Sequence, residues 1–247
     1  MSELRVLAVE GLPEVAPGDD LAELIAGRAD LEAGDVIVIS QKVVSKAEGR
    51  VVALAGVEAS QRAQELAAEL GKDPALVQVV LDESSEVLRA ERGVLICETR
   101  QGLVCANAGV DTSNVAAGHA AMLPLDPDAS AGLIRRRLRE ASGNSVAVLI
   151  SDSFGRAWRL GQSEVAIGCA GLKPLDDWRG RTDAGGQPLA ATLIATADEV
   201  AAAADLVRDK ASGVPAAIVR GLAAQVSDDD GPGDAALRRP REQDLFR

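Results

Sequence analysis

The sequence predicts a mixed α+β fold. Short apolar segments typical of strands and amphipathic segments typical of helices are interleaved along the 247 residues, but they do not alternate in the regular order of a Rossmann fold. Hydrophobic residues make up 47 % of the chain and aromatic residues only 2 %, so the core has to be built from Ala, Val, Leu and Ile. The chain is long enough to bury such a core in one large domain or two small ones.

The individual elements follow from periodicity and from cap residues. Asp19 and Asp20 can cap a short helix that begins near Leu21, Gly71 can stop a longer one, and Pro74 can begin the next. The remaining helices are expected at residues 60–70, 128–140 and 198–210. Strands are expected at residues 4–9, 36–39, 94–98, 102–106, 146–150, 193–195 and 216–219. Residues 227–234 are rich in Asp, Gly and Pro, and we expect them to be mobile.

The charge balance limits the classes of partner. A net charge of −12 argues against binding of duplex nucleic acid through its phosphates. A nucleotide remains compatible with this charge, because one basic pocket is enough to bind it, and metal cations would then screen the repulsion.

The cysteines and the apolar segments indicate in which cellular compartment the protein is expected. Cys97, Cys105 and Cys169 form no CxxC pair and have only His119 to join them, so we expect reduced core thiols rather than a zinc site or a disulfide framework. No apolar run is long enough to span a membrane. These observations predict a soluble, cytoplasmic protein.

Two aspartates are candidates for a metal site. Asp111 and Asp152 each come directly after a predicted apolar strand and beside small hydroxyl residues. Oxygen ligands at strand ends suit a hard cation such as Mg²⁺ or Mn²⁺, and Asp152-Ser153 offers a carboxylate next to a hydroxyl. The alternative interpretation is that both aspartates cap turns or helices.

Three basic residues could bind phosphate. Lys46, Arg156 and Arg159 offer the required charge, although surface ion pairing explains them equally well. Trp158, between the two arginines, could stack on a flat ring or could belong to the core. The chain contains no P-loop and no recognisable Ser-His-Asp set.

Several long stretches resemble the coenzyme F420:γ-glutamyl ligase family, like the N-terminal ligase domain of the two-domain actinobacterial enzyme. They are GLPEV at residues 11–15, GDVIVISQKVVSKAEGR at 34–50, GLVCANAGVDTSN at 102–114, and ISDSFGRAWRLGQSEVAIGCAGLKPL at 150–175. The resemblance covers nearly the whole chain, so it implies one ligase unit over residues 1–247, of mixed α/β fold, and an intertwined homodimer. It implies ligation of L-glutamate to F420-0, with GTP, Mn²⁺ or Mg²⁺, and in some members K⁺. A non-catalytic F420- or nucleotide-binding regulator and a ligase for another carboxylate cofactor remain as alternatives.

The resemblance also assigns residues. The metal ligands that it implies are Asp111, Asp152 and Ser153. The resemblance, together with the basic residues above, also implies a set of residues for nucleotide or substrate binding. They are Leu12, Pro13, Glu14, Val15, Gln41, Lys46, Asn114 and Arg156. Asp111, Asp152 and Lys46 are the expected catalytic residues.

The chain departs from the family pattern at three places. Ser40-Gln41 stands where relatives often have Thr-Ser, and residues 222–230 diverge from a nucleotide- and metal-contacting acidic segment, which one of Asp228, Asp229 and Asp230 is expected to replace. The sequence ends at Arg247 without the nitroreductase-like domain of many relatives, so no FMN is expected.

Overall fold

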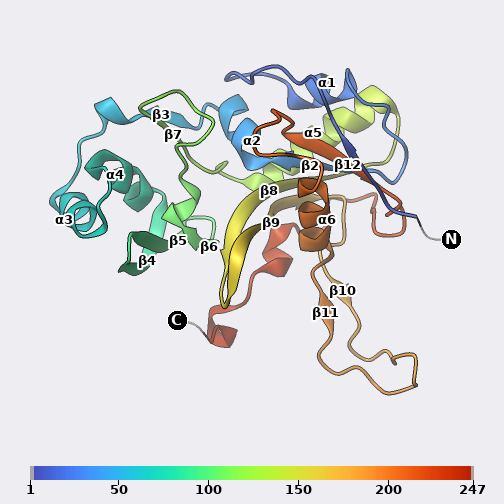
Figure 1. Cartoon of the computed structure of the whole chain (residues 1–247). Coiled ribbons are helices and arrows are strands. Elements are labelled where there is room, and N and C mark those ends of the chain that lie inside the picture. Colours follow the sequence, from blue (N-terminus) through green and yellow to red (C-terminus); the bar gives the residue numbers. More distant parts are fainter. Residues whose placement is uncertain (1–2, 246–247) are drawn as a thin grey trace.

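A five-stranded mixed sheet forms the centre of the protein (Figure 1). The structure is a computed structural model and describes residues 3–245. The strand order is β1 (Arg5–Ala8), β12 (Ala216–Arg220), β2 (Val36–Ser40), β8 (Ala147–Arg156) and β9 (Arg159–Ala170). Only β2 and β8 are parallel to each other, and the other neighbours are antiparallel. The prediction of a mixed α+β fold is confirmed.

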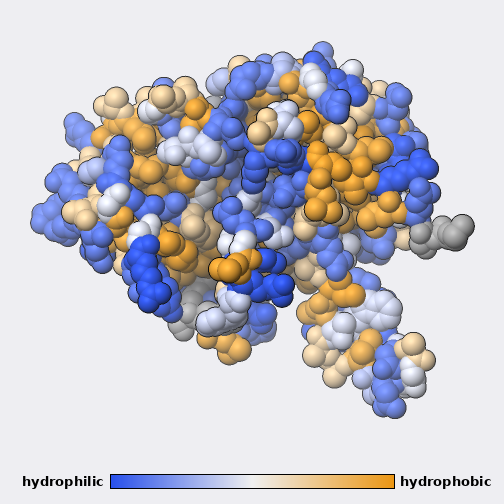
Figure 2. Space-filling view, in the orientation of Figure 1, coloured by the Kyte–Doolittle hydropathy of each residue, from blue (hydrophilic) through white to orange (hydrophobic). Residues whose placement is uncertain are grey.

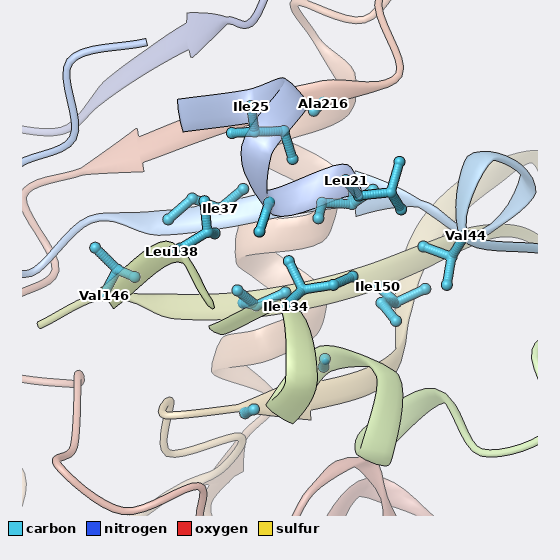
Figure 3. Packing of buried hydrophobic residues seen from close by; sticks show 14 of the residues in the cluster. Leu21, Ile25, Ile37, Val44, Ile134, Leu138, Val146, Ile150 and Ala216 are labelled. Carbon is cyan, nitrogen blue, oxygen red and sulfur yellow. The ribbon is translucent and has the colours of Figure 1, made fainter. Parts of the chain in front are cut away.

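Both faces of this sheet are covered, which explains why its central strands are apolar throughout. Successive side chains of a strand point to opposite faces, so Ile37 and Ile39 face one layer while Val36 and Val38 face the other. The first layer contains α1 (Leu21–Ala26), α2 (Gln41–Ala47) and α5 (Pro127–Ser142), whose apolar side chains pack around those isoleucines (Figure 3). Helix α6 (Thr196–Asp205) covers the other face with Ala197, Val200 and Ala204.

A second lobe, residues 51–121, has a core of its own and lies beside the sheet (Figure 1). We call it the small lobe, and the rest of the chain the main lobe. It contains α3 (Gln61–Leu70), α4 (Pro74–Asp82), β3 (Val51–Ala53), β4 (Ser84–Glu91), β5 (Val94–Thr99), β6 (Val104–Ala106), β7 (His119–Ala121) and the 3-10 turns Leu54–Gly56 and Asn107–Gly109. Leu66, Val77, Val80 and Leu95 are buried together in its core.

A long hairpin projects from the main lobe. It contains the two-residue strands β10 (Asp176–Asp177) and β11 (Leu193–Ile194) and extends away from the body (Figures 1 and 2). After β12 the chain forms two 3-10 turns, Asp234–Leu237 and Arg241–Gln243.

The predicted caps are confirmed. Asp20 accepts a hydrogen bond of 3.0 Å from the amide of Ala22 at the start of α1, and Gly71 ends α3 with φ 66°. Pro74 is in the first turn of α4. The three cysteines are free and buried, as expected. Within residues 3–245, no helix combines the length and apolar character that crossing a bilayer requires.

Residues 227–234 were expected to be mobile, but the structure packs them against α5. Arg135 is only 2 % exposed and donates to the carbonyl of Val146 at 2.8 Å and to the carboxylate of Asp230 at 2.7 Å. Its guanidinium also donates to the carbonyl of Ser227. A buried guanidinium needs acceptors, and this segment supplies them.

Candidate functional site

A cleft with a volume of about 1200 Å³ lies between the main lobe and the small lobe. In the space-filling view, hydrophilic side chains gather along the middle of the molecule, between the apolar areas of the two lobes (Figure 2). The cleft is lined by the loop after β1, the first turns of α2, residues 105–116 of the small lobe, the outer parts of β8 and β9, and the loop between α6 and β12.

The structure brings almost all of the predicted site residues to this cleft. The ones that line it are Leu12, Pro13, Glu14, Val15, Gln41, Lys46, Asp111, Asn114, Asp152 and Ser153. Arg156 is the exception: it is exposed in the β8–β9 turn, where its guanidinium donates to the carbonyl of Leu160 at 2.8 Å.

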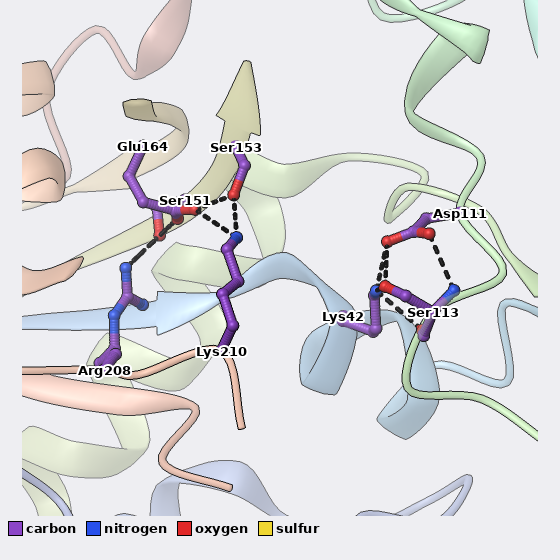
Figure 4. Close-up of polar contacts among 8 residues, drawn as sticks. All are labelled: Lys42, Asp111, Ser113, Ser151, Ser153, Glu164, Arg208 and Lys210. Carbon is purple, nitrogen blue, oxygen red and sulfur yellow. Dashed lines mark hydrogen bonds and ion pairs between the residues drawn. The ribbon is translucent and has the colours of Figure 1, made fainter. Parts of the chain in front are cut away.

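Asp111 belongs to the small lobe and is held by two neighbours (Figure 4). Its carboxylate accepts from the amide of Ser113 at 2.8 Å and from the Ser113 hydroxyl at 2.7 Å, and it forms an ion pair with Lys42 of α2. Burial by itself would raise the pKa of Asp111, but the hydrogen bonds from Lys42 and Ser113 outweigh it and lower the pKa. The turn-capping interpretation of Asp111 is therefore correct, and the same carboxylate also faces the cleft.

Asp152 is in a different electrostatic environment. Burial, followed by the nearby charge of Glu164, raises the pKa of Asp152 to about 7. The sequence placed this residue beyond the end of a strand, which is wrong, because β8 continues to Arg156 and Asp152 pairs with Val165 of β9. Strand β9 begins with exposed, largely polar and glycine residues, so it lacks the apolar signal on which the strand prediction depended.

Glu164 is the centre of a buried network that the sequence did not reveal (Figure 4). Its carboxylate accepts from the Ser151 hydroxyl at 2.6 Å and from the hydroxyl of Ser153. Since Ser151 and Ser153 are two residues apart on β8, both point to the same side of the strand. The Ser153 hydroxyl is thus directed to Glu164, not set beside the carboxylate of Asp152 as the sequence suggested.

Two cations of the loop after α6 complete this network. Arg208 donates to Glu164 at 3.2 Å and to the Ser151 hydroxyl at 3.0 Å, and the two charged side chains are 4 % and 6 % exposed. The Nε and Nη1 atoms of Arg208 are buried without a hydrogen-bond partner. Lys210 donates to the Ser153 hydroxyl at 2.5 Å. The sequence analysis placed both residues inside the helix expected at 198–210, but α6 ends at Asp205 and they lie in the loop after it.

The remaining predicted residues form the opposite wall. Lys46 pairs with Glu14 of the first loop. Gln41 is buried, and its side-chain oxygen accepts from the Ser45 hydroxyl at 2.9 Å. Lys42, one helical turn before Lys46, was missed by the sequence prediction, although residues four apart share a helix face.

The expectation that Asp228, Asp229 or Asp230 replaces the acidic segment of the family is not supported by where they lie. None of them lines the cleft. Asp230 pairs with Arg135, and Asp229 accepts from the Ser227 hydroxyl at 2.8 Å. The cleft is instead lined by residues of the 205–215 segment, which precedes β12.

The donors of the cleft suit a divalent cation. Among the residues that the structure describes, no three His, Cys, Asp or Glu side chains are grouped to hold a metal ion. Asp111 and Asp152 nevertheless offer hard oxygen donors on the same cleft. Burial and the nearby Glu164 carboxylate disfavour the charged form of Asp152 and raise its pKa. Two carboxylates on one cleft are donors that a hard divalent cation takes, so the chemistry of these two residues fits one.

The fold and the cleft define an α+β protein whose candidate site lies between two lobes and is lined by both lysines and carboxylates. The chain belongs to the F420-0:gamma-glutamyl ligase family, whose family model it matches over residues 11–221. A coenzyme F420:L-glutamate ligase of Methanothermobacter thermautotrophicus is 48 % identical over 99 % of both chains. Proteins of the same name from Methanopyrus kandleri and Haloarcula marismortui are 47 % and 43 % identical, over 100 % and 99 % of this chain and 100 % and 96 % of the relatives.

Proposed function

We propose that this protein ligates L-glutamate to coenzyme F420-0, using GTP, and that further glutamates can follow through γ-linkages. The observation that supports this most strongly is the full-length similarity to relatives named coenzyme F420:L-glutamate ligase. The cleft is compatible with it, because Lys42, Lys46 and Lys210 line the cleft and can bind phosphate oxygens. Such a site can hold a nucleotide and a carboxylate substrate together.

The chemistry needs an activated carboxylate. An oxygen of the F420-0 carboxylate attacks the γ-phosphorus of GTP, the bond to the bridging oxygen breaks, and GDP leaves. The amine of glutamate then attacks the acyl carbon, inorganic phosphate leaves, and the proton of the amine passes to water. The protein has to align the reactants and offset their charge, so no protein nucleophile is required.

The residues of the cleft can divide these tasks. Lys42 and Lys46 on α2 and Lys210 on the opposite wall can bind phosphate oxygens as point charges. Asp111 and Asp152 would hold a divalent cation, whereas the hydroxyl of Ser153 is bonded to Glu164. When bound, the cation would neutralise phosphate charge and polarise the transferred phosphoryl group. Arg208 positions Glu164 and Ser151 by donating hydrogen bonds to both side chains.

A mass spectrum tests the proposed reaction. F420-0 is incubated with the protein, GTP, Mn²⁺ and L-glutamate, and we expect its mass to increase by one or more glutamyl residues. No product should form when GTP or glutamate is omitted. A folded protein that binds F420-0 or GTP but forms no product would support the alternative of a non-catalytic regulator. Equal turnover with ATP and GTP would contradict the preference for GTP.

We also propose a homodimer. Strand β1 is at an edge of the central sheet, and Leu7 on it is 40 % exposed, while Leu4 just before it is 53 % exposed. An uncovered sheet edge with apolar side chains is a surface that a second chain could bury. Light scattering at micromolar concentration should give the mass of two chains, and a monomer mass would contradict the dimer.

A further inference from the structure

The turn that joins β8 and β9 exposes two large apolar side chains to solvent. We call residues 156–160 the rim turn. Trp158 is 87 % exposed and Leu160 is 97 % exposed, so the core interpretation of Trp158 is wrong. Trp158 also has a left-handed backbone, with φ 65°, which is costly for a bulky side chain. A large, exposed aromatic side chain at the edge of a cleft is typical of a recognition site.

The rim turn continues a wall of the cleft. Phe154 and Gly155 on β8 and Gln162 on β9 line the cleft, and the turn begins at the next residue of β8. A strand rises about 3.3 Å per residue, so Trp158 lies roughly 20 Å along the hairpin from Asp152. A ligand with one end at Asp152 can reach the turn only if it is long.

The rim turn is basic, although the chain as a whole is acidic. The chain has a net charge of −12, yet residues 154–163 contain Arg156 and Arg159 and no carboxylate. Both arginines are exposed. An indole next to two guanidinium groups suits a flat conjugated ring, on which an indole and a guanidinium can both stack.

We propose that the rim turn binds the ring end of the acceptor substrate, with the indole of Trp158 stacked on the ring. This inference rests on the proposed function. F420-0 carries a flat deazaflavin ring at one end and its reacting carboxylate at the other, joined by a ribityl phosphodiester. With the carboxylate beside Asp111 and Asp152, the ring is at the far end of the cleft, next to Trp158. The rim turn therefore sets the selectivity for the acceptor, while the two aspartates serve the reaction.

Direct binding of F420-0 tests this assignment without turnover. Calorimetry in the absence of GTP and glutamate should show that Trp158→Ala weakens F420-0 binding about tenfold, the order of effect that loss of aromatic stacking has on a flat ligand. Trp158→Phe should keep most of the affinity. The matched control is Trp178→Ala, in the hairpin that projects from the main lobe, and it should leave the affinity unchanged. Unchanged affinity in Trp158→Ala would overturn the inference.

Turnover measurements separate this inference from the proposed function. In Trp158→Ala we expect a higher KM for F420-0 and unchanged KM values for GTP and glutamate. A higher KM for GTP instead would assign the turn to the nucleotide, and a change in molecular mass by light scattering would assign it to self-association; either result overturns the inference. If the variant binds F420-0 normally while the wild type ligates glutamate, only this inference fails. If Trp158→Ala weakens binding but the wild type forms no product, only the proposed function fails.

Discussion

Lys42 and Asp111 form an ion pair across the cleft, from different lobes of the protein. Lys42 is in the first turn of α2 in the main lobe, and its ammonium also donates to the carbonyl of Ser113 at 2.8 Å and to the hydroxyl of Ser113 at 2.7 Å. Ser113 in turn holds the carboxylate of Asp111. One lysine therefore fixes the position of an aspartate to which we assign a metal.

Replacement of Lys42 should impair activity more than folding. In Lys42→Met the carboxylate of Asp111 loses its cationic partner and the cleft loses a charge for phosphate, so we expect the kcat/KM for F420-0 to fall roughly 100-fold. Thermal unfolding should change little, because the ion pair is partly exposed. Lys173→Met, at an exposed position outside the cleft, is the control. Near-normal kcat/KM in Lys42→Met would show that the pair is only a surface contact.

The buried pair Glu164–Arg208 should show strong coupling in stability. Removal of either partner leaves a buried charge without its counterion, which costs about 3 kcal/mol or more. We expect this loss of unfolding free energy in Glu164→Leu and in Arg208→Met, measured by urea unfolding. The double variant removes both charges, so it should be much more stable than the sum of the single losses predicts. Additive losses would mean that the two side chains do not depend on each other.

Gly171 should tolerate no side chain. It has φ 76°, and a Cβ atom there would lie 2.1 Å from Nε of the buried Arg135. Gly171→Ala should therefore cost about 1 kcal/mol for the left-handed backbone and a further 1–3 kcal/mol for the displaced side chain. Gly186→Ala is a matched control, because Gly186 has φ 81° and nothing within 4 Å of the added Cβ. Equal losses of unfolding free energy in the two variants would contradict the packing of residues 227–234 against Arg135.

Much of the main lobe could be predicted from the sequence. Its central strands are buried on both faces and read as continuous apolar runs, and its helices begin at recognisable caps such as Asp20. Strand β4 and the first half of β9 could not be predicted in this way. Their side chains are largely exposed and polar. These strands are formed by hydrogen bonds between backbone groups of paired strands, and such pairing has no signature in the local sequence.

Part of the candidate site could also be predicted, because some of its residues follow apolar segments of the sequence. Asp111 and Asp152 stand out because they follow apolar segments, and the structure places both on the cleft. Glu164 and Arg208 are each ordinary charged residues in the sequence. They become part of the site only because the β8–β9 pairing and the loop after α6 bring them together with Ser151. Contacts between residues 44 positions apart have no pattern that a single sequence reveals.

The dependence of ligation on Asp152 and Mn²⁺ tests the central claim most directly. Glutamate addition to F420-0 is measured over a titration of Mn²⁺ for the wild type, Asp111→Asn, Asp152→Asn and the control Asp177→Asn, which alters an exposed residue outside the cleft. Asn caps turns about as well as Asp, so we expect both cleft variants to keep the circular dichroism of the wild type. We expect them to lose ligation roughly 100-fold or more at limiting Mn²⁺, whereas Asp177→Asn keeps it. Folded cleft variants that retain near-normal ligation at limiting Mn²⁺ would contradict the assignment of these aspartates to a catalytic metal.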